Sequence, residues 1–356
     1  MRQKRLKAPA NSYSKMAYYH CVSRVVNRDF VLGDIEREEF VRLMRAYERL
    51  CGLRVVTYCV MSNHFHVLVG VPKRPEVLPS NTALIDIVRA SLGDLAATNL
   101  EYDLGQAAKI KSALWEEEIR ERYFRRMWDV SSFMKTLKQR FTQWFNRAHK
   151  RKGTLWEDRF RSVLVQSAGE PVAAMAAYID LNPIRANMVE DPKEYRWSGY
   201  GAAMGGDADA VEGLREIDRL RADQLMSAEA VQKSEMSLKR SAVEILETYR
   251  TLLYGRGQER GVAEDGSALK KGFTREESKQ VVAEGGRLPS AAYLRCRVRY
   301  FTDGAVIGSK DFVNGIFKDL RERFGEKRKT GARLMRGLAK DEKLYAMRDL
   351  KRDPVA

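Results

Sequence analysis

The sequence predicts an α+β fold in which helices pack against an antiparallel sheet. Segments with apolar residues at helical spacing alternate with short segments of aromatic and β-branched residues, in the order β-α-β-β-α-β. The chain has 356 residues, of which 44% are hydrophobic and 31% charged, so it is long enough for a sizeable core and a second domain. This order is that of a ferredoxin-like (RRM-like) sheet, to which a mainly helical insertion and a C-terminal extension are added.

The first four elements follow from local patterns. Residues 17–26 mix aromatic and β-branched side chains and predict a strand. Residues 34–50 begin with acidic residues and place their apolar positions on one face, which predicts a helix that ends at Gly52. Residues 53–71 read as two strands joined around residues 61–63.

The middle of the chain changes to helix-forming sequence. We interpret residues 75–129 as a helical insertion or lid, with two helical segments separated by residues 102–106. From Ser131 a basic helix follows, whose apolar stripe is Phe133, Leu137 and Phe141. Residues 154–167 are then a strand candidate, and Glu170-Pro171 opens a helix that reaches Asn182-Pro183.

The domain organisation follows from this order and from composition. We expect one domain over residues 1–200, which contains the insertion at about 75–129. The Gly- and Asp-rich stretch 201–214 predicts a linker, and residues 215–356 a mainly helical, basic extension of unknown role. In that extension, residues 295–301 look like a short strand, TDG like a turn, and Ser309 like a helix N-cap.

Charge favours a polyanionic partner. Lys and Arg total 64 against 48 Asp and Glu, a net charge of +16. Nucleic acid is preferred to a membrane, because no basic amphipathic helix with an aromatic face stands out and no apolar run approaches the ~18 residues that span a bilayer. The four cysteines form no CxxC pair, and the N-terminus leads into no hydrophobic signal core. The expected location is the cytoplasm, in association with the nucleoid.

The most distinctive local feature is Asn63-His64-Phe65-His66 in an apolar strand. Strand alternation sends His64 and His66 to one face and Phe65 to the other. Two neutral imidazoles at this spacing suit a divalent metal, with room for a third protein ligand. The alternative is an HxH pair that is structural or only hydrogen-bonded.

A second candidate lies in the later helix. Tyr178 and Asn182 are four residues apart and therefore share a helix face. The alternative is that Tyr178 is an amphipathic core residue and that Asn182, before Pro183, caps a following helix.

Three motifs together resemble a known family. MSNHFHVLV, GTLWEDRFRS and YIDLNPIRANMV occur in this order, and the chain resembles a REP-associated tyrosine transposase, within the HUH single-strand transposases of small insertion sequences. The resemblance covers about residues 15–200. It implies that residues 1–200 are an HUH catalytic domain, that Tyr178 is the nucleophile, and that His64, His66 and Asn182 bind the metal.

The resemblance also implies the reaction. A metal ion, expected to be Mg²⁺ or Mn²⁺, polarises the scissile phosphate of single-stranded DNA, and Tyr178 attacks it. The covalent 5′-phosphotyrosine retains the phosphodiester energy, so cleavage and strand transfer are one reaction run in two directions. The implied substrates are hairpins of palindromic repeats, and the protein is expected to be a monomer or a homodimer.

Basic residues near these motifs supply the predicted DNA channel. Nine basic residues, from Lys135 to Arg161, lie within 27 residues and are interleaved with aromatic side chains, so phosphate contacts and base stacking are both available. The alternatives are core packing for the aromatic side chains and a solvated face for the charges. The predicted DNA-binding residues are Lys138, Arg140, Arg147, Lys150, Arg151, Lys152, Arg159 and Arg161, with Arg24 and Arg185 flanking the catalytic segments.

Two other functions stay open at this stage. The first is a non-catalytic, sequence- or hairpin-specific DNA-binding regulator that keeps the sheet and the basic face. The second is a replication initiator or relaxase, which shares HUH chemistry and differs in its DNA target. The cognate hairpin, and whether Tyr178 acts in its own subunit's site, are not encoded in these motifs.

Overall fold

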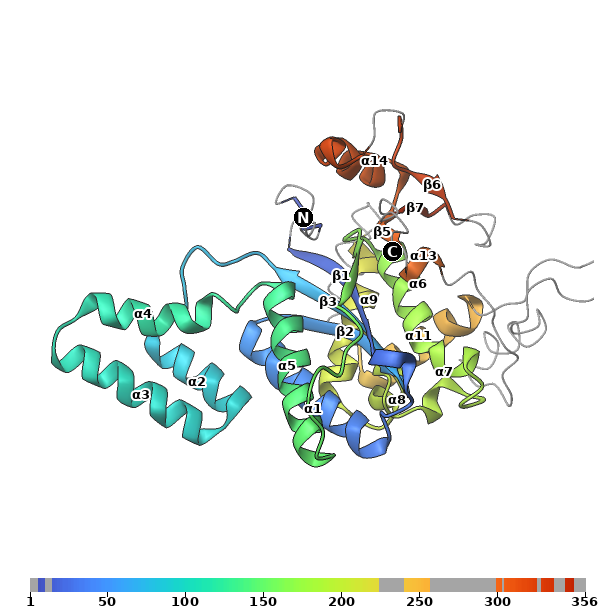
Figure 1. The fold of residues 1–356 in the computed structure, drawn as a ribbon. Helices are drawn as coiled ribbons and strands as arrows, with labels where there is room; N and C mark the ends of the chain where they lie inside the picture. The colour runs from blue at the N-terminus through green and yellow to red at the C-terminus, as the bar shows by residue number, and fades with distance from the viewer. Residues whose placement is uncertain are drawn as a thin grey trace, which may run out of the picture.

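A computed structural model describes residues 6–9, 15–223, 240–256, 299–302, 304–324, 328–335 and 343–348. The described residues form a seven-stranded sheet covered by helices on both faces (Figure 1). None of their helices has the length and apolar character needed to cross a membrane.

The first four strands have the predicted ferredoxin-like order. The order β2-β3-β1-β4 places the first strand between the third and the fourth, and all three pairings are antiparallel. The α+β class is therefore confirmed. The strands are β1 (Met16–Arg24), β2 (Arg54–Val60), β3 (His64–Pro72) and β4 (Arg161–Val165).

Strand alternation builds a different core on each face of the sheet. On one face, Phe65 and Val67 pack with α1 (Asp34–Cys51) and α5 (Val130–Ala148). The predicted apolar stripe of α5 is fully buried there. On the other face, Leu68 and Val163 pack with α6 (Gly169–Asp180), α9 (Ala208–Asp223) and α11 (Ala242–Arg256). Short helices complete the connections: η1 (Val26–Arg28), α7 (Asn182–Arg185), η2 (Pro192–Glu194) and α8 (Gly199–Met204).

The C-terminal segments extend the sheet, which the sequence analysis did not predict. β5 (Gly304–Gly308) runs parallel to β4, and β7 (Tyr345–Arg348) and β6 (Arg333–Leu334) follow it. The expectation of a mainly helical extension is therefore incomplete in this part of the chain. The fully buried run GAVIG explains the difference, because its β-branched residues pack on both faces of the sheet.

The strand expected at residues 295–301 is also misplaced. Within the described residues, Arg299–Thr302 forms the helical turn α13, and the strand begins at Gly304; residues 295–298 lie outside the described part. The N-cap prediction is confirmed, since the Ser309 hydroxyl accepts a hydrogen bond from Phe312 N at 3.2 Å and starts α14 (Lys310–Asp319). A short turn, η3 (Arg321–Arg323), follows α14.

The insertion consists of three helices that project beside the sheet (Figure 1). The predicted break at residues 102–106 is wrong, because one helix runs through it and keeps Leu104 and Ala107 on its buried face. The chain turns instead at Gly93, where φ is 88°, and at Lys111, where φ is 56°. The three helices are α2 (Asn81–Leu92), α3 (Asp94–Lys109) and α4 (Ala113–Phe124).

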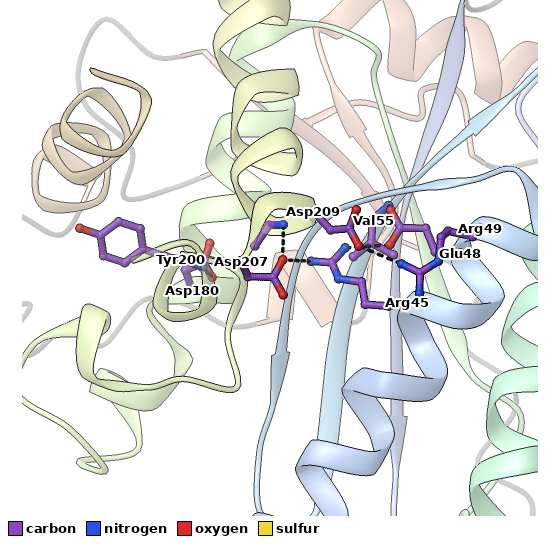
Figure 2. Close-up of polar contacts among 9 residues, drawn as sticks. Arg45, Glu48, Arg49, Val55, Asp180, Tyr200, Asp207 and Asp209 are labelled. Atoms are coloured by element: carbon purple, nitrogen blue, oxygen red, sulfur yellow. Dashed lines mark hydrogen bonds and ion pairs between the residues drawn. The ribbon is translucent and has the colours of Figure 1, made fainter. Parts of the chain in front are cut away.

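Residues 201–214 do not form the expected linker. α8 occupies the start of this stretch, and α9 begins at Ala208 and packs on the sheet and on α6. At the start of α9, Asp209 accepts a hydrogen bond from Arg49 of α1 at 3.0 Å, and Asp207 lies 3.9 Å from the Arg45 guanidinium (Figure 2). The glycines and aspartates that suggested a flexible segment instead permit close packing and form ion pairs.

The Gly213→Ala substitution should show how tightly α9 packs. A methyl group at Gly213 would collide with the carbonyl oxygen of Val56 in β2, so we expect a loss of about 1–3 kcal/mol in the free energy of unfolding. Gly105 in α3 is the matched control, because no atom lies within 4 Å of the position that a methyl group would take there. Gly105→Ala should therefore raise the free energy of unfolding by about 0.5–1 kcal/mol. Equal changes for the two variants in denaturant titrations would contradict the close packing of α9 on β2.

Candidate active site

The paired histidines lie where β3 meets β1. His66 is opposite Val22 and His64 is opposite Arg24, and the centroids of the two imidazole rings are 5.0 Å apart. Phe65 between them is fully buried in the core on the opposite face. The alternation predicted for the HxH motif is thus observed, and both rings stand on the α6 face of the sheet.

Asn63 determines how the His64 ring is presented. The amide nitrogen of Asn63 donates to the Arg28 carbonyl at 2.9 Å, which turns its amide oxygen toward His64. That oxygen lies 2.7 Å from His64 Nδ1 and can only accept, so Nδ1 carries the proton. The lone pair of His64 is therefore on Nε2, where it is available to a metal ion.

Tyr178 of α6 lies against the histidines. Its ring meets His66 edge-on at 5.7 Å between centroids and stacks on Phe301 at 4.4 Å. The side chain is 3% exposed. The sequence analysis placed Tyr178 and His66 in one site, and the structure brings their rings together from elements more than a hundred residues apart.

Asn182, the first residue of α7, contacts the end of α6. Its amide nitrogen donates to the carbonyls of Tyr178 at 3.0 Å and Ile179 at 3.1 Å. Both bonds use the nitrogen, so the amide oxygen is the atom that Asn182 can offer a metal. The donor set would then be two imidazole nitrogens and one amide oxygen, which suits Mn²⁺ or Mg²⁺ with positions left for phosphate oxygens.

The side-chain chemistry therefore fits a divalent cation without a carboxylate ligand. Among the described residues, no three His, Cys, Asp or Glu side chains gather as a metal site. The proposed ligand set has two histidines and one carboxamide, that of Asn182. Which residues bind the metal stays a prediction.

Three of the predicted phosphate-binding arginines surround these groups. Arg24 projects beside His64 on the neighbouring strand. Arg185 lies with its guanidinium 4.6 Å from the centroid of the Tyr178 ring and donates to the Tyr178 carbonyl at 2.6 Å. Arg161 continues the cross-strand row of His66 and Val22. Arg24 and Arg161 thus lie on the strands beside the histidines, and Arg185 lies over the Tyr178 ring.

The other predicted DNA-binding residues lie on α5 and between α5 and β4. Lys138 is buried, and its ammonium donates to the Asp158 carbonyl at 2.7 Å, so its hydrogen bond is within the protein. The aromatic side chains of Phe145, Trp156 and Phe160 are likewise in the core, as the alternative interpretation held. Of the predicted residues on α5 and the loop after it, Arg151 is half-buried, and the exposed ones are Arg140, Arg147, Lys150, Lys152 and Arg159.

Two contacts in the site were missed by the sequence analysis. His20 of β1 is fully buried; its Nε2 lies 2.9 Å from His66 Nδ1, and its Nδ1 lies 3.0 Å from the Phe301 carbonyl oxygen. Phe301 belongs to α13, so the C-terminal extension contributes to the site through its ring and its backbone. The scarcity of histidine, four in the chain, was a signal for His20; no sequence signal marked Phe301.

Burial controls the protonation of these groups. Desolvation lowers the pKa of His20 to about 4, and desolvation together with the nearby Arg24 cation lowers the pKa of His64 to about 4. Desolvation, and then the neighbouring histidines and arginines, lowers the pKa of His66 well below its usual value. All three imidazoles are consequently neutral at pH 7, the form that binds metal.

Asp180 connects α6 to the elements around it. It is fully buried and accepts hydrogen bonds from Thr57 Oγ1 at 2.8 Å, Tyr249 OH at 2.6 Å and Tyr200 N at 3.1 Å. Figure 2 shows the side chain beside Tyr200. Desolvation raises the pKa of Asp180 to about 6, despite the hydrogen bonds that favour the carboxylate. The contacts tie α6 to β2, α8 and α11, and so fix the position of Tyr178.

The metal-free protein should lose stability in mild acid. The buried histidines stay neutral to about pH 4, whereas in the unfolded chain they bind protons below about pH 6.5, so stability falls as pH drops through this window. Below pH 6 the folded protein binds a proton at Asp180 before the unfolded chain does, which raises the free energy of unfolding and offsets the loss from about one histidine. We expect a net loss of about 2–4 kcal/mol in the free energy of unfolding between pH 7 and pH 5. The test is urea titration with a chelator present. Equal free energies of unfolding at pH 7 and pH 5 would contradict this prediction.

The sheet order and the two helical layers define an α+β protein with a ferredoxin-like core. Residues 13–82 match the family described as Transposase IS200 like. The match confirms, over these residues, the resemblance to transposases of small insertion sequences. It covers β1, α1, β2 and β3 and therefore includes both histidines of the HxH motif.

Comparison with solved structures gives a distant likeness. A REP-associated tyrosine transposase bound to a REP hairpin has 15% sequence identity to this chain and a TM-score of 0.35, over 58% of this chain and 86% of that chain. A search of curated proteins found no match.

Proposed function

We propose that this protein is a metal-dependent single-stranded DNA endonuclease and strand transferase, a transposase that acts through a covalent 5′-phosphotyrosine at Tyr178. The observation that carries the proposal is the edge-on contact of Tyr178 with His66, at 5.7 Å between ring centroids. A nucleophile candidate and a paired-histidine metal motif thus meet in one cluster, and the two histidines lie within the segment that matches an insertion-sequence transposase family.

In this reaction the Tyr178 hydroxyl oxygen attacks the scissile phosphorus. The bond between that oxygen and phosphorus forms, the bond to the 3′ oxygen breaks, and the tyrosine proton leaves while the 3′ oxygen gains one. A divalent cation would act as a Lewis acid on the phosphate, held by His64, His66 and the Asn182 amide oxygen. Arg24 and Arg185 would bind the remaining phosphate charge.

Access to the nucleophile requires a rearrangement. Tyr178 is 3% exposed, with Phe301 stacked on its ring, so DNA binding must be accompanied by a movement that uncovers the phenol. Attack by a second 3′ hydroxyl on the phosphotyrosine then completes strand transfer without an energy cofactor.

The proposed substrates are hairpins formed by short palindromic repeats. The motif resemblance suggests this choice, and the net charge of +16 favours a nucleic acid partner. The most direct test incubates the protein with repeat hairpins carrying a 5′ or a 3′ label, with Mn²⁺ or Mg²⁺, on a denaturing gel. The proposal predicts a metal-dependent protein adduct that retains only the label downstream of the cleavage site. Tight hairpin binding without an adduct in either metal would favour the non-catalytic DNA-binding regulator.

A further inference from the structure

His20 connects the C-terminal extension to the candidate metal ligands. It lies on β1 with no exposed surface, and its ring stacks on that of His66, with 5.1 Å between centroids and 12° between planes. One ring nitrogen faces the Phe301 carbonyl oxygen at 3.0 Å, and the other faces His66 Nδ1 at 2.9 Å. Three groups from α13, β1 and β3 therefore form one continuous hydrogen-bonded chain.

The direction of these hydrogen bonds follows from the first acceptor. A carbonyl oxygen can only accept, so His20 Nδ1 carries a proton and donates it to Phe301. In a neutral imidazole the other nitrogen, Nε2, then has the lone pair and must accept. Its partner, His66 Nδ1, is consequently the donor, and the lone pair of His66 is on Nε2.

A neutral His20 is favoured by its surroundings. Both of its hydrogen-bond partners are uncharged, and a buried cation without a counter-charge is costly. The Arg185 and Arg24 cations act electrostatically on His66 and disfavour another positive charge in the same place. A protonated His20 would also force a proton onto His66 Nε2 and block that ligand atom.

We propose that His20 is a positioning residue that selects the Nδ1–H tautomer of His66 and so keeps its Nε2 lone pair available for a divalent cation. Asn63 does the same for His64 through its amide oxygen, so each ligand of the HxH pair has its own acceptor. The cation's identity rests on the proposed function, whereas the tautomer is a property of the metal-free protein. The Phe301 carbonyl makes the extension part of this arrangement.

The tautomer can be measured directly because the chain has four histidines. In the metal-free full-length protein, ring ¹⁵N–¹H correlation spectra should show His66 with a protonated Nδ1 and a lone pair on Nε2. His20→Leu removes the acceptor, and we expect His66 to populate both tautomers. A wild-type His66 that is protonated at Nε2 would overturn the proposal without any variant being made.

Metal affinity provides the second readout, with Mn²⁺ as the probe in calorimetry. His20→Leu should weaken Mn²⁺ binding about 10–100-fold, as loss of a hydrogen-bonding partner of a metal ligand typically does. His20→Gln can donate to Phe301 and accept from His66, so it should restore affinity to within a few-fold of wild type. His149→Gln is the control, because His149 bonds to Glu36 instead.

The outcomes separate this inference from the proposed function. Unchanged affinity and an unchanged His66 tautomer in His20→Leu would overturn the positioning role. If the wild-type protein shows the expected His66 tautomer but binds no Mn²⁺, the positioning role of His20 is supported and the metal-dependent function is rejected. Should His20→Leu fail to fold, the wild-type spectrum and the affinity of His20→Gln still decide.

Discussion

Tyr178→Phe is expected to abolish the covalent protein–DNA product, with a loss of at least about 10³-fold in cleavage. The substitution removes the attacking oxygen and keeps the ring, which stacks on Phe301 and lies beneath the Arg185 guanidinium. The fold and the affinity for the hairpin should therefore stay close to wild type. Cleavage is measured on denaturing gels, and hairpin affinity by fluorescence anisotropy.

Tyr102→Phe provides the matched control for the loss of a phenol oxygen. Tyr102 is 65% exposed on α3, in the insertion, and should retain wild-type cleavage. Persistence of the adduct in Tyr178→Phe would show that another residue is the nucleophile, and the assignment of Tyr178 would then be wrong.

His64→Ala and His66→Ala are each expected to lower the rate of metal-dependent cleavage by at least about 10³-fold. Each substitution deletes one of two imidazoles whose rings are 5.0 Å apart, so a single replacement leaves the cation with half of its nitrogen ligands. Treating the wild-type protein with a chelator should reduce cleavage to the same level. Hairpin binding without metal should change little, because phosphate contacts come mainly from arginine and lysine.

His149→Ala controls for the loss of a histidine. His149 follows α5, and its Nε2 donates to Glu36 Oε1 at 2.9 Å, in a contact with α1 rather than with the HxH pair. It should retain cleavage and its metal dependence. Cleavage that survives in His64→Ala and is insensitive to chelation would contradict a metal ion at this pair.

The core of the fold could be predicted because its signals are local. Helical spacing in residues 34–50 and alternation in residues 53–71 lie within single elements, and the four-strand order follows from connecting them. The extension of the sheet could not be predicted, since it depends on Leu164 pairing with Val306 across a long stretch of chain. Nothing in either segment alone encodes that register.

Glycine was the main source of error. Gly205 and Gly206 led us to expect a linker over 201–214, and both do lie between α8 and α9. Gly213, however, is inside α9, where the absence of a side chain permits contact with β2. A sequence pattern does not distinguish a glycine that loosens the chain from one that allows close packing.

The candidate site was predictable where spacing decides geometry. The i, i+2 spacing placed His64 and His66 on one face, as observed. The i, i+4 spacing predicted a shared helix face for Tyr178 and Asn182, but α6 ends at Asp180 and Asn182 begins α7, where its side chain donates to the Tyr178 carbonyl. His20 and Phe301 were not predictable, because the hydrogen bond between them joins positions 281 residues apart. Their contribution depends on cross-strand register and on the return of the C-terminal extension to the sheet.

Mass spectrometry of the trapped adduct can show whether Tyr178 becomes covalently joined to DNA. The wild-type protein is incubated with a cleavable hairpin and Mn²⁺, digested with trypsin and nuclease, and its modified peptide is sequenced. We expect a nucleotide 5′-phosphate on the tryptic peptide that contains Tyr178, attached to that tyrosine. A nucleotide on another residue, or cleaved DNA with no modified peptide, would contradict it.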